Sequence, residues 1–382
     1  MNRPLLMVAY LSLFCFGFVD NLRGPFYPLI LDHFKLSTHQ GSWFWAWASV
    51  SAFLVNITSP LWLSQLSGLR WMAIGLVSLA FGPISLGLSL WFNSQSVLWV
   101  STFFWGLGFA LINQMVSLFI IKIGDSQKRR RLMGGAHATF GLSAMMAPLA
   151  INFWMKNQQP DNYRWFFFFA VIPLTVFLMT MFLKEGPRFQ PVKRETAISV
   201  RVWIRWALLF GSYIALEVLV SSRLILYLKE SVGLAAEESH FQLTLFFLMM
   251  LLGRLVLAFV SISIYGRSLL LLSVLGTLLF LYIGIFYLYH FLAVCGFSMA
   301  FFFPVVMDVM AEEYGSSSEQ LVPLAFSGVD AFLVIFHLGF GQMVFRFGID
   351  KAMYLNLALA VWVLILILFL PKAGQLQKGS EL

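Results

Sequence analysis

The sequence predicts an all-α integral membrane protein with twelve transmembrane helices in two pseudo-symmetric halves of six. Three observations carry this prediction. Of the 382 residues, 60% are hydrophobic and only 11% are charged, whereas soluble domains carry about 25% charged residues. The apolar runs are about as long as the ~20 residues that a helix needs to cross a bilayer. The longest polar connection, residues 184–205, divides those runs six and six.

The first half contains six predicted membrane helices. They cover residues 5–31, 42–64, 71–92, 96–121, 131–155 and 163–184. The first run has no small-residue cleavage site after it, so we expect a retained helix rather than a signal peptide. The second half repeats the pattern at residues 203–229, 239–261, 268–288, 291–311, 321–345 and 351–370. The predicted organisation is therefore an N-terminal bundle (1–184), a cytoplasmic linker (185–202) and a C-terminal bundle (203–382).

The charge distribution predicts the topology. Most Lys and Arg residues fall in the N-terminus, the even-numbered connections and the C-terminal tail. By the positive-inside rule both termini are cytoplasmic, in an inner or plasma membrane. The net charge of +8 thus reflects topology, and we expect lipid and a small solute as partners, not nucleic acid. Nothing in the sequence indicates an oligomer, so we expect a monomer.

A weak internal repeat supports two related halves. The segment ILDHFKLSTHQGS (30–42) resembles YLKESVGLAAEES (227–239). Carried back along each helix, this alignment places Asp20 within one residue of Glu217. Many secondary transporters are built from repeated bundles with polar groups near the middle of the membrane.

The first helix carries Asp20, Asn21 and Arg23 inside an apolar run. A charge at the bilayer centre costs at least about 2.5–3.5 kcal/mol, so it must face a partner or a cavity. Asp20 and Arg23 are three residues apart and can pair on one helix face. We interpret the pair as ion-coupling or gating groups and Asn21 as a solute contact; a purely structural ion pair is the alternative. Pro25 and Pro28 predict a local break just outside the pair.

Glu217 is the second candidate for ion coupling and also a candidate for solute binding. It has no basic residue at helical spacing, because Arg223 is six residues away. A buried acid without a countercharge keeps its proton, as a coupling carboxylate requires. The alternative is an acid that only bridges two helices.

Neutral amides and further titratable groups occur inside other predicted helices. Asn56, Asn113 and Gln114 suit a hydroxyl-rich or zwitterionic solute, although amides commonly join helices as well. The histidine His137 is a candidate solute contact or relay group. Asp330 and His337, seven residues apart and on one face, are candidates for proton relay or gating.

Two further groups lie at helix ends. Asp308, near the cytoplasmic end of its helix, is interpreted as a gate or a cap. We expect the tryptophans of SWFWAW (Trp43, Trp45 and Trp47) to lie in the interfacial aromatic belt, with sugar stacking as the alternative.

No motif indicates an enzyme. The sequence has no Walker motif, HExxH, zinc-ligand spacing or GxSxG. We therefore expect no catalysis, no metal site and no cofactor, and transport driven by a proton gradient, with Na⁺ as the other possible coupling ion.

Several segments resemble the major facilitator superfamily, and within it the fucose–proton symporter group of sugar transporters. YIALEVLVSSRLILYLKESVGLAAEES, with Tyr213 and Glu217, is similar to that group's seventh helix. GGAHATFGLSAMMAPL is similar to its fifth helix, and GRLVLAF and GFSMAFFFPVVMD to its eighth and tenth. The resemblance implies a twelve-helix sugar–proton symporter.

This chain departs from the family pattern at two places. The family's fourth-helix carboxylate falls on Asn113. In the loop SQLSGLRW, Gln65 replaces the usual acid, while Gly68 and Arg70 remain; the matching SIYGR keeps Gly266 and Arg267.

Together these features predict a secondary active transporter for a small polar, sugar-like solute, working by alternating access and proton symport. A proton-coupled exporter of a drug, siderophore or other metabolite is the alternative within transport. A receptor or scaffold that binds without transport is the alternative from another class.

Overall fold

A computed structural model describes residues 3–122, 126–157, 164–184, 186–189, 198–260, 262 and 264–370. All regular structure in these ranges is helical. The first six helices are α1 (Arg3–Phe34), α2 (Thr38–Trp62), α3 (Gly68–Trp91), α4 (Gln95–Ile121), α5 (Ser126–Asn157) and α6 (Arg164–Met181). They are followed by α7 (Val200–Glu230), α8 (Ala236–Phe259), α9 (Gly266–Phe286), α10 (His290–Met299), α11 (Phe302–Tyr314), α12 (Ser318–Phe347) and α13 (Ile349–Leu368).

The predicted fold class is confirmed. Among the described residues, nine helical segments are long and apolar enough to cross a membrane, and α10 with α11 counts as one of them, His290–Tyr314. Trp165–Met181 is a shorter apolar helix, while α2 and α5 are long enough, at 25 and 32 residues, but more polar. Each predicted span therefore corresponds to one helix, except the tenth, which α10 and α11 form together.

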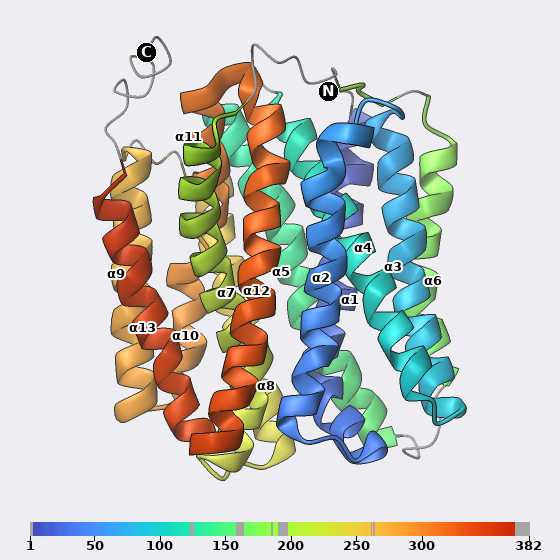
Figure 1. Cartoon of the computed structure of the whole chain (residues 1–382), viewed down its shortest axis with the longest axis vertical. Coiled ribbons are helices and arrows are strands. Elements are labelled where there is room, and N and C mark those ends of the chain that lie inside the picture. The colour runs from blue at the N-terminus through green and yellow to red at the C-terminus, as the bar shows by residue number, and fades with distance from the viewer. Residues whose placement is uncertain are drawn as a thin grey trace.

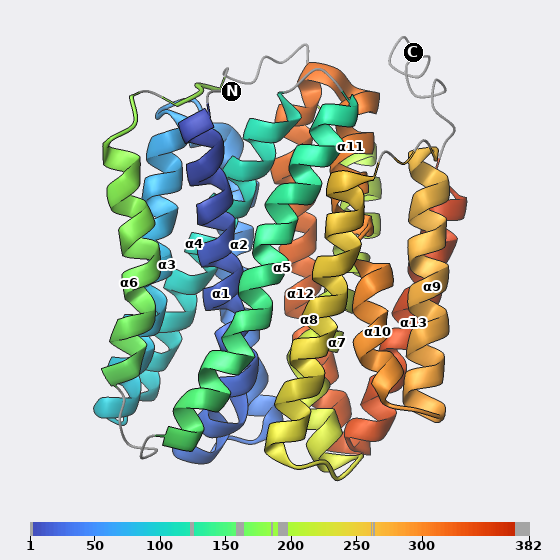
Figure 2. The ribbon, with the colours of Figure 1, turned by 180° about the vertical axis from the view of Figure 1, so that it is seen from behind.

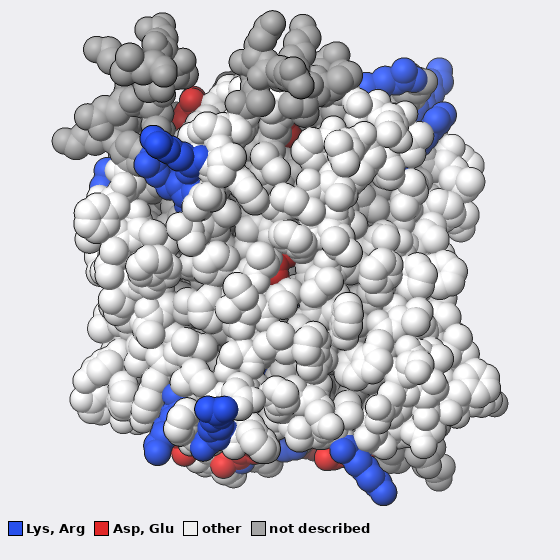
Figure 3. Space-filling view, in the orientation of Figure 1, with Lys and Arg blue, Asp and Glu red and all other residues white. Residues whose placement is uncertain are grey.

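The helices form two groups that lie side by side. Figure 1 shows α1–α6 on one side and α7–α13 on the other, with α2 next to α12, and Figure 2 shows α5 next to α8. The start of α1 and the end of α13 lie on the same side of the molecule, which we call the terminal face (Figure 1). We call the other end the opposite face. Charged side chains appear mainly at these two faces, and the band between them is almost uncharged (Figure 3).

Glycines let the two groups approach closely. A Cβ added to Gly134 would lie 3.1 Å from the backbone nitrogen of Ala258. One added to Gly141 would lie 3.3 Å from the Cα of Leu251, so α5 and α8 pack almost backbone to backbone. At the contact between α2 and α12, a Cβ on Gly341 of α12 would meet the side chain of Ser42 on α2. These small residues serve the close helix packing that membrane proteins favour.

Serines begin four of the helices. Ser37 forms a capping box with Gln40 at the start of α2, each side chain bonding to the other's backbone nitrogen. Ser67, Ser94 and Ser199 accept hydrogen bonds from the first turns of α3, α4 and α7. Such caps satisfy backbone N–H groups that have no partner within the helix.

The tenth span is broken between α10 and α11. Pro304 has no N–H to donate to the carbonyl of Ala300, and its ring crowds that carbonyl, so the helix interrupts there. The Tyr213 hydroxyl donates to the carbonyl oxygen of Met299 at 2.9 Å, which satisfies a backbone acceptor beside the break. The break therefore has a local cause in the sequence and a partner on α7.

The predicted break at Pro25 and Pro28 is wrong, because α1 is helical through both prolines. The cause is that each proline removes only one hydrogen bond, while neighbouring helices hold this buried segment in place.

Within the predicted linker 185–202, α7 begins at Val200, and residues 185 and 190–197 lie outside the described part. The domain boundaries therefore stay a prediction.

Candidate functional site

A polar cavity lies between the two groups of helices. It has a volume of about 110 Å³, with walls from α1, α2 and α4 on one side and α7 and α12 on the other. Its polar lining residues are Asp20, Arg23, Ser49, Asn56, Asn113, Asp330 and His337. We call it the central cavity. Six of the residues predicted from the sequence therefore share one site: Asp20, Arg23, Asn56, Asn113, Asp330 and His337.

Asp20 and Arg23 form the predicted ion pair within α1. The Arg23 Nη2 contacts the Asp20 Oδ1 atom. The guanidinium also lies over the rings of Trp45, at 4.6 Å, and Phe109, at 4.7 Å. The Arg23 side chain is 7% exposed and that of Asp20 is 21% exposed. The pairing is confirmed, and aromatic faces shield the cation while the carboxylate stays more accessible.

Asn56 and Asp330 join the two groups of helices across the cavity. The Asn56 Nδ2 of α2 donates to the Asp330 Oδ2 of α12 at 2.7 Å, and both residues are buried. The Asn56 Oδ1 is buried with no hydrogen-bond partner. His337 lines the same cavity as Asp330, as their seven-residue spacing predicts. The sequence identified these side chains separately, and the fold brings them together.

The tryptophans of α2 do not all lie in the aromatic belt. Trp43 and Trp47 are 38% and 41% exposed, as belt residues would be. Trp45 is only 3% exposed, and its ring stacks on His337 with 5.5 Å between centroids. The belt prediction is therefore wrong for Trp45, because the residue between the two exposed rings turns to the inner face of the helix.

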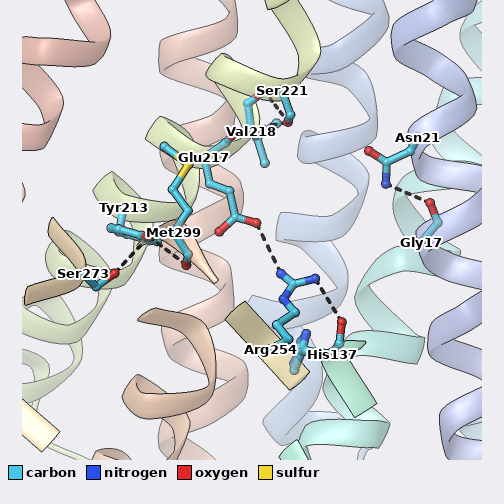
Figure 4. A network of polar contacts seen from close by, with 10 residues as sticks. All are labelled: Gly17, Asn21, His137, Tyr213, Glu217, Val218, Ser221, Arg254, Ser273 and Met299. Carbon is cyan, nitrogen blue, oxygen red and sulfur yellow. Dashed lines mark hydrogen bonds and ion pairs between the residues drawn. The ribbon is translucent and has the colours of Figure 1, made fainter. Parts of the chain in front are cut away.

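The amides of α4 and α1 divide into those that reach the cavity and those that do not. Asn113 lines it, and its Oδ1 is buried without a hydrogen-bond partner. Gln114 lies outside the lining, and both its amide atoms are buried and unpartnered. Adjacent helical residues point about 100° apart, which explains the difference. Asn21 also lies outside the lining, and its Nδ2 donates to the carbonyl of Gly17 at 2.8 Å (Figure 4).

A second polar cluster surrounds Glu217. Its Oε1 lies 3.6 Å from the Nη2 of Arg254 on α8, and Figure 4 shows the two side chains pointing toward one another. The expectation that Glu217 has no basic neighbour is therefore wrong, because the partner comes from another helix. Its Oε2 is buried without a hydrogen-bond partner. Glu217 is not among the residues that line the central cavity, although Val218 is.

His137 joins this cluster through its backbone. Its carbonyl accepts a hydrogen bond from the Arg254 Nη1 at 3.0 Å (Figure 4). Its ring packs against Phe303 with 4.1 Å between centroids, and the ring Nε2 is buried without a partner. His137 lies outside the central cavity. Arg254 thus connects α5 of the first group to α7 and α8 of the second.

Ion pairs between the two groups close the terminal face. Asp308 of α11 pairs with Arg129 of α5, Nη2 to Oδ1 at 2.8 Å, and also with Arg130. Lys122, at the end of α4, lies 3.2 Å from the Glu319 carboxylate at the start of α12. The interpretation of Asp308 as a gate gains a geometric basis, since both partners belong to the other group of helices.

Aromatic rings and one arginine close the opposite face. The Arg223 side chain is fully buried, and its guanidinium lies 4.7 Å from the Tyr27 ring and 5.6 Å from each of the Trp45 and Phe340 rings. Its Nη2 donates to the Ser42 Oγ at 3.4 Å. No carboxylate in the described part of the chain pairs with Arg223. Contacts between the two groups of helices thus join them at both faces, with the central cavity in between.

Sequence reasoning missed two members of these clusters. Arg254 lies within the segment GRLVLAF, and Arg223 is six residues from Glu217, too far along α7 to pair with it. A signal was present for both: each is a cation inside an apolar run, which indicates a partner or a cavity. The partner itself depends on which helices pack together.

The family model of the Major Facilitator Superfamily matches residues 9–319. No curated protein matches the sequence.

Solved structures of transporters share the fold. The E. coli fucose:proton symporter FucP is 16% identical, with a TM-score of 0.70 over 95% of this chain and 98% of that chain. The proton:xylose symporter XylE is 12% identical, with a TM-score of 0.77 over 96% and 95%. The human organic anion transporter MFSD10 is 14% identical, with a TM-score of 0.70 over 96% and 99%.

The match over residues 9–319, together with the two groups of membrane helices around a central polar cavity, shows that this chain belongs to the major facilitator superfamily.

Proposed function

We propose that this protein is a secondary active transporter that moves a small polar, sugar-like solute by alternating access, coupled to proton symport. The observation that carries the proposal is the Asn56–Asp330 hydrogen bond, which spans the central cavity from one group of helices to the other. A solute that competes for either side chain would loosen the contact between the groups.

The size of the cavity supports a mechanism in which the groups separate. Ligand pockets usually measure about 300–1,000 Å³, whereas the central cavity measures about 110 Å³. A sugar-sized solute therefore needs the cavity to widen. Opening the terminal face requires loss of the Asp308 and Glu319 ion pairs, and opening the opposite face requires loss of the Arg223 contacts.

Asp330 is our first candidate for the coupling acid. Its side-chain hydrogen bond is to a neutral amide, whereas Asp20 pairs with Arg23 and Glu217 with Arg254. A buried carboxylate without a cation gains most from binding a proton. The proton would also find an acceptor, because the Asn56 Oδ1 has no partner. Na⁺ is the alternative coupling ion, since carboxylate and amide oxygens also suit a hard cation.

The other assignments follow from the fold and the charge distribution. We infer an inner or plasma membrane location with cytoplasmic termini, which makes the terminal face the cytoplasmic face. We infer a monomer in lipid, without nucleic acid, catalytic activity or a bound cofactor. The fucose and xylose symporters among the structural neighbours support the sugar-like solute and the proton.

A proton-coupled exporter of a drug, siderophore or other metabolite is the second candidate. The apolar part of the lining favours it: Phe16, Phe109, Ile214, Val218, Phe326 and Leu333 all face the cavity. Such walls suit a solute with a hydrophobic part. A receptor or scaffold has no use for a buried acid that joins two movable groups.

The test uses purified protein in sealed liposomes that contain a pH-sensitive dye. Hexoses, deoxysugars, amino acids and cationic dyes are added outside, with and without Na⁺. Symport predicts solute-triggered acidification in the wild type and none in Asp330→Asn. Asp32→Asn is the matched control, because Asp32 is exposed and outside the cavity. Release of protons from the liposomes when a dye is added would contradict symport and indicate export.

Counterflow of a labelled solute separates transport from simple binding. Asp330→Asn should retain solute exchange, since exchange needs the cavity to alternate without net proton movement. Binding of a solute without any counterflow in the wild type would contradict a transporter and indicate a receptor. Unchanged proton movement in Asp330→Asn would remove Asp330 as the coupling acid.

A further inference from the structure

A second and larger hollow lies on the terminal face, away from the central cavity. It has a volume of about 710 Å³ and is bounded by the start of α3, the end of α6, residues 64–67, and Leu183, Lys184 and Arg188. It shares no lining residue with the central cavity. Nothing in the proposed transport cycle uses it. We call it the α3–α6 pocket.

The lining of this pocket is cationic. Arg70, Lys184 and Arg188 face it, together with the neutral polar residues Ser64, Gln65, Ser67 and Thr180. No Asp or Glu belongs to its described lining. Neither Arg70 nor Lys184 pairs with a carboxylate in the described ranges. Figure 3 shows basic side chains gathered at the terminal face over the ends of α3 and α6. The pocket therefore favours an anion.

The inner wall of the pocket is held by packing. The Gly68 N–H donates to the Pro187 carbonyl at 2.8 Å. A Cβ on Gly186 would lie 2.9 Å from the backbone nitrogen of Leu69, so residues 186–189 lie directly against α3. Phe189 is 3% exposed, and the Lys122 ammonium lies 4.6 Å from its ring. These contacts keep Arg188 and Lys184 close to Arg70.

An apolar surface continues from the pocket along α3 and α6. Phe177, Met181 and Leu183 belong to the pocket lining. Further along the same helices lie the exposed apolar side chains of Ile74, Phe81, Leu174 and Leu178. An inorganic anion would use only the basic residues. A molecule with an anionic head and hydrocarbon tails would use both surfaces.

We propose that the α3–α6 pocket binds the phosphate headgroup of an anionic phospholipid from the leaflet at the terminal face. The guanidinium group of Arg70 donates to phosphate oxygens, as planar guanidinium groups do in bidentate pairs, and the charge of Arg188 adds to the local positive potential. Lys184 adds a point charge, and the acyl chains lie along the exposed side chains of α3 and α6. Basic clusters at membrane surfaces attract anionic lipids in this way.

Lipid binding is measured by native mass spectrometry of the full chain released from micelles doped with phosphatidylglycerol or phosphatidylcholine. Wild type should retain phosphatidylglycerol preferentially. The triple variant Arg70→Gln/Lys184→Gln/Arg188→Gln should lose at least about tenfold of that preference, since each Lys or Arg near the surface contributes to anionic-lipid attraction. Arg201→Gln is the matched control, because Arg201 is exposed on the same face outside the pocket, and should leave retention unchanged.

Two further measurements separate loss of the headgroup site from loss of folding, and a bound lipid from free phosphate. Arg70→Lys preserves the charge and should retain most of the preference even if the triple variant does not fold. Inorganic phosphate is added as a competitor during thermal unfolding. Stabilisation by phosphatidylglycerol but not by phosphate supports the lipid. Equal retention by wild type and triple variant, or full replacement of the lipid by phosphate, would overturn the proposal.

Discussion

Asp308→Asn should open the terminal face. The substitution removes the carboxylate that pairs with Arg129 and Arg130, and these pairs join α11 to α5 of the other group of helices. The Asp308 and Arg129 side chains are 1% and 6% exposed, so the pair lies in a poorly solvated place. Removing one partner of a buried pair costs about 3–5 kcal/mol.

The size of the effect follows from this burial. Because the Arg130 side chain is 19% exposed, we assign it little energy and take about 3 kcal/mol for the whole change. The cost falls on the state in which the terminal face is closed. At about 1.4 kcal/mol per tenfold, the ratio of open to closed molecules should rise on the order of 100-fold.

Pulsed electron paramagnetic resonance measures this ratio. Spin labels at positions 70 and 201 report the width of the terminal face, and labels at 95 and 237 report the opposite face. Both native cysteines, Cys15 and Cys295, are buried, so background labelling stays low. Asp308→Asn should add a longer distance to the first pair and none to the second.

Glu312→Gln is the control. Its carboxylate lies 3.8 Å from Arg130 and its side chain is 42% exposed, and such surface pairs contribute about 1 kcal/mol or less. If Glu312→Gln and Asp308→Asn changed the distance distribution equally, burial would not set the strength of the gate and the reasoning would be refuted.

Three more substitutions test other contacts. Arg223→Gln removes the cation from the rings of Tyr27, Trp45 and Phe340, so the label pair at 95 and 237 should report opening of the opposite face by about tenfold; an unchanged distribution would contradict the assigned closure. Glu217→Gln leaves the Arg254 guanidinium, which is 3% exposed, without its carboxylate. This variant should lower the midpoint of thermal unfolding at every pH where Glu217 is ionised. Arg267→Gln, on the terminal face, is measured for comparison. Gly106→Ala places a Cβ against the backbone of Ala48, which should destabilise the protein by about 1–3 kcal/mol in the same unfolding measurement, while Gly339→Ala, where an added Cβ meets nothing within 4 Å, should not.

The number, order and grouping of the membrane helices could be predicted from the sequence, because hydrophobic length and the polar segment 184–205 are one-dimensional signals. The Asp20–Arg23 pair could be predicted for the same reason, since both residues lie on one helix. Contacts between helices could not. The pairing of Glu217 with Arg254, and of Asn56 with Asp330, depends on which faces meet after folding. Asn113 and Gln114 show the limit most clearly, since neighbours of similar chemistry face different surroundings.

The break in the tenth span gives α11 a mechanical independence that an unbroken rod would not have. α10 packs with α8 and α9, while α11 packs with α9 and α12, carries Asp308 and reaches α5 of the other group. A tilt of α11 alone would admit water and ions from the terminal face while the rest of its bundle stays at rest. Such a partial movement is a leak pathway, and it would dissipate an ion gradient without moving solute. Tyr213, one helical turn from Glu217, donates its hydroxyl to the Met299 carbonyl at the end of α10 and stacks its ring on Phe302 at the start of α11. It is therefore placed to restrain that tilt until the bundle moves as a unit.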